Sequence, residues 1–212
     1  MFTVFLIGNI ASGKSTAARY LESRGAQRLD LDQMAKDLYI PGSTLVQQVA
    51  DEFGWDVLDE NGGIRTAVLA KRAFANSESI SRLNAIVHPV VLHQLSLRLL
   101  PANCCSTVVP QYELTVVEIS APMSCLDAFG LADDVIAITA PLDIRRARAV
   151  ERGMDAADFA CRAEIQPSGE ELCKLATTVI DNTRADDSLF AALDAWLARR
   201  GLGHMTSGIA DA

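Results

Sequence analysis

The stretch over residues 8–16 constrains this 212-residue chain more than any other. It is Gly-Asn-Ile-Ala-Ser-Gly-Lys-Ser-Thr and fits G-x-x-x-x-G-K-[ST], the pattern of a phosphate-binding loop. The apolar run before it, residues 2–7, predicts a short buried strand, and residues 15–23 predict a helix that ends near Gly25. Motif and context together predict a site for the phosphates of a nucleotide, and they leave the reaction open.

Each part of this loop has a physical task. Gly8 and Gly13 permit a tight turn whose N–H groups point at phosphate oxygens, and the N-terminus of the following helix adds a positive field. Lys14 is expected to lie exposed until phosphate arrives and to reach the β- and γ-phosphates, while the Ser15 hydroxyl is expected to bind Mg²⁺. The residues expected to bind the nucleotide here are Ala11, Ser12, Gly13, Lys14, Ser15 and Thr16.

The composition narrows the class of protein. Half of the residues are hydrophobic, which is ample for a core, and the net charge of −8 disfavours a general nucleic-acid binder. Five cysteines, an odd number without a C-x-x-C pair, favour reduced thiols and a cytoplasmic protein. The N-terminus lacks the basic start of a signal peptide, and no apolar run approaches the ~20 residues of a membrane helix. We therefore expect neither a nucleic-acid nor a membrane partner.

Apolar runs separated by helical patterns predict an α/β fold. The further strands are expected at residues 27–31, 115–119, 135–139 and 178–180, and helices between and after them at 142–151, 156–165 and 186–199. Such an alternation predicts a three-layer fold, in which helices cover both faces of a parallel sheet. The ligand should then lie at the carboxyl ends of the strands.

Residues 33–100 are almost entirely helical in pattern, which is too long for a simple crossover between strands, so they should form a lobe of their own. The helices are expected at 33–39, 44–53, 65–74, 77–86 and 89–100. Ser43 or Thr44 is expected to cap the second of them and Ser77 the fourth. The pair His88-Pro89 is expected to break the helical pattern.

Two groups of charged residues could carry chemistry. Asp30 and Asp32 follow the second strand, where a carboxylate can accept a substrate proton or bind Mg²⁺ through water; alternatively, Asp32 caps a helix that starts at Gln33. Arg145, Arg148 and Arg152 have the spacing of one helix face. That face is either a solvated stripe or a phosphate clamp, which Arg162 of the next helix could close; Arg146 points elsewhere.

Further motifs follow the loop along the chain. They are Asp30-Leu31-Asp32, Pro41-Gly42, Phe53-Gly54, Gly62-Gly63-Ile64-Arg65, Arg72-Ala73-Phe74, Leu83-Asn84-Ala85-Ile86-Val87-His88-Pro89, Arg148, Arg152, Arg162, Gln166 and Val179-Ile180-Asp181-Asn182. In this order they resemble the dephospho-coenzyme A kinases, from residue 2 to about residue 182. The His-Pro motif with the late Val-Ile-Asp-Asn is far more specific than the loop, which many unrelated proteins share.

The resemblance implies a kinase of three parts. These are a nucleotide-binding core (1–32, 101–144 and 176–200), a helical coenzyme A lobe (33–100) and a lid (145–175). Separately, the small polar end of the sequence, residues 201–212, is expected to be a flexible tail. The γ-phosphate of ATP, with Mg²⁺, would be transferred to the 3′-hydroxyl of dephospho-coenzyme A by a cytoplasmic monomer or weak homo-oligomer. The implied catalytic residues are Lys14, Asp32 as the base, and Arg148; Arg152 and Asn182 would bind ATP, and Arg65 and His88, with Asp32, the acceptor. Taken alone, a single His is more often structural than functional.

One segment departs from the family pattern. Where the family usually has Pro-Leu-Leu-Phe-Glu after its third core strand, residues 117–127 are Val-Glu-Ile-Ser-Ala-Pro-Met-Ser-Cys-Leu-Asp, so Leu126 stands at the Glu position. This departure is compatible with weakened activity or another acceptor, and Glu118 is then the strand-end acid available to position Mg²⁺.

Two other functions fit part of the sequence. The nearest is a kinase for another small-molecule hydroxyl or nucleotide. The second is a GTP-dependent switch, because residues 127–130 fit D-x-x-G, but the guanine-specifying Asn-Lys-x-Asp is missing after the strand at 135–139.

Overall fold

The computed structural model describes residues 1–99 and 112–205 of the chain. It divides into two compact units, Met1–Asp30 with Cys104–Ala212, and Leu31–Asn103. Residues 100–111, Cys104 and Cys105 among them, lie outside the described residues, as do residues 206–212 of the expected tail.

The first unit is built on a parallel sheet of five strands in the order β2-β3-β1-β4-β5. The strands are β1 (Phe2–Ile7), β2 (Gln27–Asp30), β3 (Leu114–Ile119), β4 (Asp134–Thr139) and β5 (Thr178–Asp181). The chain thus leaves β1 toward one side and later returns to its other side, so the strand order reverses at β1. Because ligands of such sheets bind where the order reverses, the loop after β1 lies at the predicted position.

Alternating residues of β1 point to opposite faces of the sheet, and both faces are buried. Val4 and Leu6 pack in one apolar core with α1 (Lys14–Ser23) and α9 (Ser188–Arg199). Phe5, on the opposite face, packs edge-on against Phe129 with ring centres 5.7 Å apart, and α8 (Gly169–Leu175) lies against β4. The predicted α/β fold with helices on both faces of a parallel sheet is therefore confirmed.

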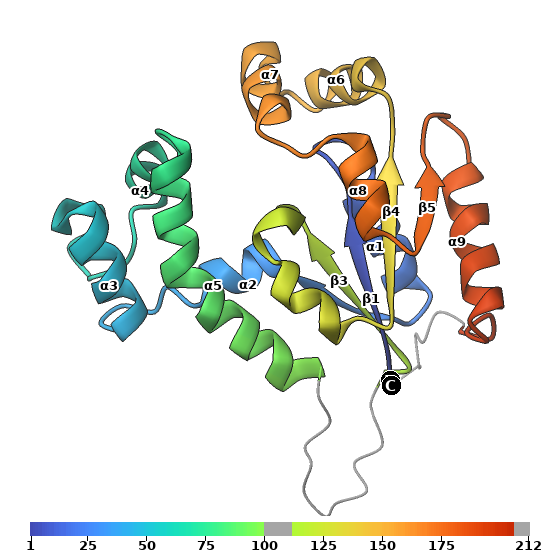
Figure 1. Ribbon diagram of the computed structural model, residues 1–212, viewed down its shortest axis with the longest axis horizontal. Helices are drawn as coiled ribbons and strands as arrows, with labels where there is room; N and C mark the ends of the chain where they lie inside the picture. Colours follow the sequence, from blue (N-terminus) through green and yellow to red (C-terminus); the bar gives the residue numbers. More distant parts are fainter. Residues whose placement is uncertain (100–111, 206–212) are drawn as a thin grey trace, which may run out of the picture. The chain divides into compact units, whose positions relative to one another are not determined.

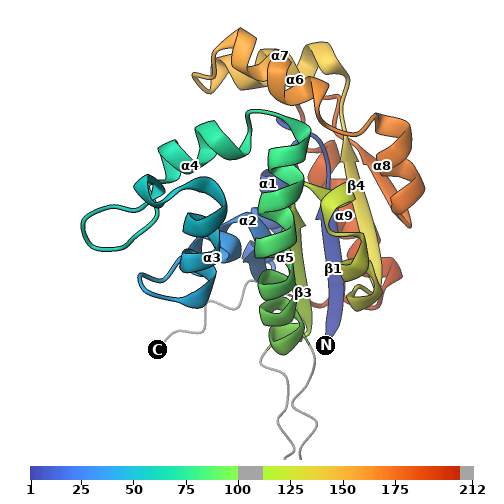
Figure 2. The same cartoon turned by 60° about the vertical axis from the view of Figure 1, so that its left-hand side comes forward.

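Two further helices of this unit lie beyond the carboxyl ends of the strands. They are α6 (Leu142–Glu151) and α7 (Ala156–Glu164). Figure 1 and Figure 2 both show the arrowheads of β1 and β4 pointing toward the end of the sheet where α6 and α7 lie. The face predicted to bind the ligand is therefore the face from which the arginine-bearing helix rises.

The C-terminal end of the described chain corrects the expected tail. Leu202 and Met205 are buried in the apolar core beside Trp196, and the Met205 N–H donates to the carbonyl oxygen of Leu202 at 3.1 Å. Leu202 and Met205 thus belong to the core, whereas residues 201, 203 and 204 are exposed.

The second unit is helical, and α5 contacts each of its other helices. Its elements are α2 (Leu31–Asp37), α3 (Thr44–Phe53), the 3₁₀ turn η1 (Trp55–Val57), α4 (Thr66–Ala73) and α5 (Ser77–Leu99). The Ser43 hydroxyl caps α3 by accepting the N–H of Val46 at 3.3 Å. Since α2 begins at Leu31, directly after β2, Asp32 lies inside the first turn and does not cap a helix at Gln33.

Helix α5 corrects two predictions. Its cap is Asn76, whose side-chain oxygen accepts the Ser79 N–H at 2.8 Å, and not Ser77. The helix also continues through Pro89. Proline removes one helical hydrogen bond but has a helical φ, and a buried stripe passes through the site unbroken. That stripe consists of Val87, Val91, Leu95 and Leu99. Burial of this stripe compensates for the bond that is lost.

A buried carboxylate joins β4 to α9 in the first unit. The side chain of Asp134 is fully buried and accepts hydrogen bonds from Trp196 Nε1 at 2.8 Å and from Arg200 Nε at 2.7 Å. The Thr177 hydroxyl, just before β5, donates to the other carboxylate oxygen. Asp134 therefore fixes the last strand and the last helix to the sheet.

We predict that Asp134→Ala destabilises the protein by about 1–3 kcal/mol, the usual cost of leaving a buried donor without its acceptor. The reason is that the buried Trp196 N–H then has no acceptor, whereas the Arg200 side chain is 41% exposed and can bind water. Unfolding in urea measures this loss. Asp143→Ala, at an exposed position of α6, is the control and should cost less than about 1 kcal/mol. Equal losses in the two variants would contradict the assignment.

Candidate active site

The loop between β1 and α1 has the backbone of a phosphate cradle. Ala11 has a φ of 59°, which an L-residue adopts at a cost of about 1 kcal/mol, and Gly13 has a φ of 107°. Left-handed residues within such a loop turn successive N–H groups toward one side, where they form a concave site for an anion. The N-terminus of α1 opens onto the same site, because Lys14 is its first residue.

The loop is held from one side by Asn182, the residue that follows β5. Its side-chain Nδ2 donates to the carbonyl oxygen of Ser12 at 2.7 Å, and its own N–H donates to the carbonyl oxygen of Thr139 at 2.8 Å. A Cβ at Gly13 would overlap the Asn182 amide. Gly13 is therefore required both for its φ and for the close approach of Asn182.

Residues near the start of α8 hold the loop from another side. The Ile10 N–H donates to the side-chain oxygen of Gln166 at 2.8 Å, and Asn9 Nδ2 donates to the carbonyl oxygen of Pro167 at 2.9 Å. The first half of the loop is thus fixed by residues more than 150 positions away. The Ser12 N–H donates to the carbonyl oxygen of Asn9 at 3.1 Å, and the N–H groups of residues 11 and 13–15 are those that can face phosphate.

Below the loop, the carboxylate of Glu118 on β3 gathers three donors, and we call Glu118, Ser15, Lys14 and Arg28 the Glu118 cluster. The Ser15 hydroxyl donates to Oε1, and Arg28 Nη2 donates to Oε2 at 2.9 Å. Lys14 Nζ lies 3.6 Å from Oε1 and donates to the Ser120 hydroxyl at 3.3 Å. The expectation that Lys14 is exposed is wrong, since only 8% of it is accessible.

The cluster keeps a buried acid ionised. Burial by itself raises the pKa of Glu118, but the hydrogen bonds from Ser15 and Arg28, with the charges of Lys14 and Arg28, outweigh burial and hold that pKa below its ordinary value. A charged Glu118 can orient the Ser15 hydroxyl and neutralise part of the Lys14 charge until an anion binds.

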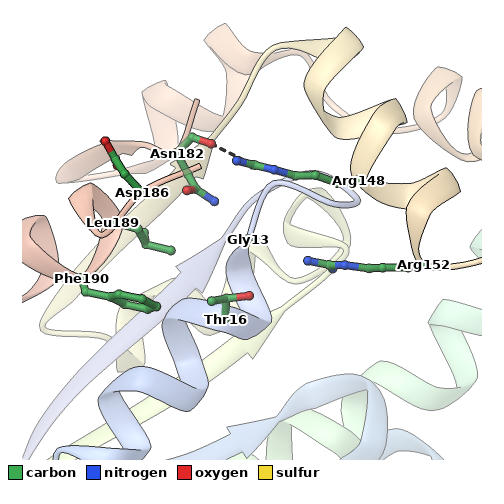
Figure 3. A pocket seen from close by; sticks show the side chains of 8 residues that line it. All are labelled: Gly13, Thr16, Arg148, Arg152, Asn182, Asp186, Leu189 and Phe190. Atoms are coloured by element: carbon green, nitrogen blue, oxygen red, sulfur yellow. Dashed lines mark hydrogen bonds between the residues drawn. The ribbon is translucent and has the colours of Figure 1, made fainter. Parts of the chain in front are cut away.

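A pocket of about 170 Å³ opens beside the start of α1 (Figure 3). It is lined by Gly13, Thr16, Arg148, Arg152, Asn182, Asp186, Leu189 and Phe190. Apolar side chains from α9 form one wall, and Asn182 and the two arginines line other parts of it. Such a mixture suits a flat heterocycle joined to a negatively charged group.

The structure separates the arginines that the sequence placed on one helix face. Arg148 Nη1 donates to the carbonyl oxygen of Asn182 at 2.8 Å, and Arg152 follows the last residue of α6; both line the pocket. Arg145 is buried elsewhere, where its Nε donates to the carbonyl oxygen of Ala140 at 3.1 Å. Arg146 and Arg162 are exposed. Only Arg148 and Arg152 therefore face the pocket beside the loop.

The residues expected on the acceptor side all belong to the second unit. Asp32 is exposed in the first turn of α2, and His88 is half-buried within α5. Arg65 directly precedes α4, and its backbone N–H donates to the carbonyl oxygen of Val57 at 2.7 Å. Their assignment to the acceptor stays a prediction.

Sequence reasoning missed several residues that hold the site. Arg28, Ser120 and Asn9 carry no motif, and Phe190 belongs to the amphipathic face of a helix. Arg28 gave one usable signal. A charged residue inside a short strand that borders a strand with a buried acid indicates an ion pair, and the register of β2 on β3 places Asp30 opposite Glu118, next to Arg28.

Comparison with known proteins identifies the family of this chain. The family model described as "Dephospho-CoA kinase" matches residues 2–187. The chain belongs to the dephospho-CoA kinase family. A "Dephospho-CoA kinase" of Corynebacterium diphtheriae is 36% identical over 191 residues, which cover 89% of this chain and 92% of that protein.

Solved structures share the fold of this family member. A crystal structure of a protein from Thermus thermophilus superimposes with a TM-score of 0.73 at 30% identity and covers 93% of this chain and 97% of its own. A dephospho-CoA kinase from Campylobacter jejuni gives a TM-score of 0.66 at 20% identity, with 94% and 98% covered. This second likeness supports the fold alone.

Two structural features, a membrane-spanning helix and a cluster of metal ligands, are absent from the described residues. Across residues 1–99 and 112–205, no helix combines the length and the apolar character needed to cross a membrane. Within the same ranges, no group of three or more His, Cys, Asp or Glu side chains is arranged to hold a metal ion.

We predict that Glu118→Gln lowers the free energy of unfolding at pH 7 by at least about 2 kcal/mol, because Lys14 and Arg28 lose their carboxylate. A depressed pKa in the folded state contributes stability that is complete above the unfolded value, 4.5, and is lost as the pH falls through the folded pKa. The difference between wild type and variant should therefore shrink only below about pH 4.5.

Urea unfolding of both proteins from about pH 7 to pH 3 measures this difference. Glu22→Gln, at an exposed position of α1, is the matched control and should change stability little at any pH. A Glu118→Gln difference that is unchanged down to pH 3 would show that the carboxylate charge does not hold the cluster together.

Proposed function

We propose that this family member transfers the γ-phosphate of ATP to the 3′-hydroxyl of dephospho-CoA and so forms coenzyme A. The observation that carries the proposal is the phosphate-binding loop with Lys14 and Ser15 on a buried Glu118, in a chain that matches the family over residues 2–187. A small-molecule substrate and ATP both follow from membership of a kinase family.

The ATP side of the reaction rests on the first unit. The phosphates are proposed to lie in the loop over residues 11–16, and the adenine in the pocket beside Asn182. When phosphate binds, the Lys14 ammonium is proposed to leave the Ser120 hydroxyl and to contact the β- and γ-phosphates. Its hydrogen bond to that neutral hydroxyl, 3.3 Å long, is weak, so little is lost when it breaks. Arg148 and Arg152 would stabilise the charge that shifts to the leaving diphosphate.

The donor set near the loop fits Mg²⁺. This ion favours one or two protein ligands with the remaining positions taken by phosphate oxygens and water, and a cage of three acids is not needed. Ser15, whose hydroxyl is already oriented by Glu118, would provide one ligand, and Glu118 would receive hydrogen bonds from metal-bound water. The ion, when bound, neutralises charge on the β- and γ-phosphates.

Asp32 is the proposed base, and Arg65 and His88 are proposed to bind the acceptor. The Asp32 carboxylate would accept the proton of the 3′-hydroxyl as the 3′-oxygen bonds to the γ-phosphorus. The bond between that phosphorus and the β,γ-bridging oxygen breaks, and ADP leaves. Exposure of Asp32 and its position directly after a sheet strand are compatible with this role.

We also propose a cytoplasmic protein that is a monomer or weak homo-oligomer. The reason for the compartment is chemical: Cys161 and Cys173 are exposed free thiols, and Cys125 is buried. Free exposed thiols are typical of a reducing compartment.

Incubation with ATP, Mg²⁺ and dephospho-CoA, followed by mass spectrometry, tests the function. The product should be heavier than the acceptor by one phosphoryl group, and Lys14→Met should form none. A parallel panel of nucleosides, nucleotides and sugars tests the second candidate, a kinase for another hydroxyl, which the departure at residues 117–127 keeps open. Phosphorylation of a panel compound in preference to dephospho-CoA, or GTP retention without any acceptor, would overturn the proposal.

We predict that Arg148→Ala and Arg152→Ala each lower turnover more than tenfold, or about 1.4 kcal/mol of transition-state stabilisation. Both side chains line the pocket beside the loop. Arg146→Ala, in α6 but outside the lining of this pocket, is the matched control and should change turnover by less than about twofold. Steady-state kinetics at saturating ATP measure the effects. Equal small effects at all three positions would favour a solvated stripe.

We predict that Asp32→Asn lowers turnover by roughly 10²–10⁴, the usual contribution of a positioned base, since an amide accepts no proton at neutral pH. The variant should melt within a few degrees of wild type, because Asp32 is exposed and lies in a helix turn that tolerates Asn. ATP binding should be normal. Asp30→Asn is the comparison and should lose less. A collapse confined to Asp30→Asn would move the base two residues toward the N-terminus.

A further inference from the structure

A second pocket lies behind the phosphate-binding loop, within the first unit. It has a volume of about 90 Å³ and is lined by Asn9, Ser12, Ile138, Thr139, Ala140, Arg145, Gly169 and Leu172. None of the functions proposed above uses it. Its polar side chains come from the loop (Asn9 and Ser12), from the end of β4 (Thr139) and from α6 (Arg145).

Two buried polar atoms that line this pocket have no hydrogen-bond partner. They are the Ser12 hydroxyl oxygen and Arg145 Nη1. Ser12 is 1% exposed and Arg145 is 9% exposed, so bulk water compensates for neither. Buried donors without partners are rare in folded proteins, and each costs about 1–3 kcal/mol or more for a charged group. Two of them around one pocket indicate that the pocket has an occupant.

The charge of Arg145 defines the chemistry of that occupant. Arg145 Nε donates a hydrogen bond to the carbonyl oxygen of Ala140, and burial lowers the pKa of the Arg145 guanidinium. Arg145 forms no ion pair with the carboxylates of the described residues. A guanidinium can only donate, and a serine hydroxyl can also donate, so both can bind one acceptor. Water would satisfy the hydrogen bonds but would leave the positive charge without a counter-ion.

We propose that this pocket binds a small inorganic oxyanion of the size and charge of phosphate, through Arg145 Nη1 and the Ser12 hydroxyl. The volume admits such an ion and excludes a nucleoside. Because Ser12 belongs to the loop and Arg145 to α6, the ion joins the loop to the helix that carries Arg148. The site is separate from the phosphate cradle formed by the backbone of residues 11–15, and it does not depend on which acceptor the kinase uses.

Calorimetric titration with inorganic phosphate at constant ionic strength tests the proposal. All proteins carry Lys14→Ala, so that binding in the cradle is weakened and the second pocket dominates. In this background, Arg145→Met should weaken phosphate binding at least tenfold, while Arg146→Met, in the next and exposed position, should leave it unchanged. Ser12→Ala removes only the hydroxyl and should also weaken binding, which keeps the test valid if Arg145→Met does not fold.

Three results would overturn the proposal. One is the absence of phosphate binding in the Lys14→Ala protein. The second is equal affinity in the Arg145→Met and Arg146→Met proteins. The third, if Arg145→Met does not fold, is unchanged affinity in the Ser12→Ala protein. Melting temperatures of the folded variants, measured with and without phosphate, give an independent readout, because a ligand of the native state raises the melting temperature and loss of the site removes that rise.

Discussion

A single buried carboxylate determines how the nucleotide site is assembled. An isolated ionised acid in the interior costs many kcal/mol, so Glu118 can stay charged only if donors surround it. Those donors come from two elements, Arg28 from β2 and Lys14 and Ser15 from the first turn of α1, while Glu118 itself lies on β3. The requirement to satisfy one charge therefore fixes the start of α1 against two strands, and it places the lysine and the serine hydroxyl that phosphate chemistry needs.

The loop above this cluster gains its shape from distant residues. Its N-terminal half is anchored by Gln166 and Pro167, and its C-terminal half by Asn182, whose amide occupies the space that only Gly13 leaves free. A backbone with Ala11 in the left-handed region is strained and would relax without such anchors. The same residues that could contact a nucleotide therefore also keep the empty loop ready for phosphate, and less ordering remains to be done on binding.

The sequence predicted what local patterns decide and failed where distant packing decides. The strands, the loop and the order of helices follow from apolar periodicity and one strong motif, and the fold class was right. The predicted helix break at Pro89 was wrong because burial of the apolar stripe of α5 outweighs one lost hydrogen bond. The predicted exposure of Lys14 was wrong because Glu118 lies beneath it. Arg145 was grouped with Arg148 by spacing alone, yet the two line different pockets, because Arg145 donates to the carbonyl oxygen of Ala140 and Arg148 to that of Asn182. The spacing of residues along the sequence does not show which distant residues will lie next to them, and those neighbours decide such cases.

The segment that departs from the family pattern, residues 117–127, includes the end of β3 and extends into the turns that follow it. Its first residues, 117–119, still belong to β3, and Glu118 keeps its partners. Beyond β3, Pro122, Cys125 and Ala128 are buried at a spacing of three, the period of a 3₁₀ turn. Pro122 lies in η2 (Pro122–Ser124), Ala128 lies in η3 (Leu126–Leu131), and Cys125 stands between the two turns. The D-x-x-G match at residues 127–130 thus belongs to a turn that packs by Ala128 and Phe129. Because its buried positions serve packing, the segment leaves the phosphate machinery intact, and any change of acceptor must come from its exposed residues, Met123 and Leu126 among them.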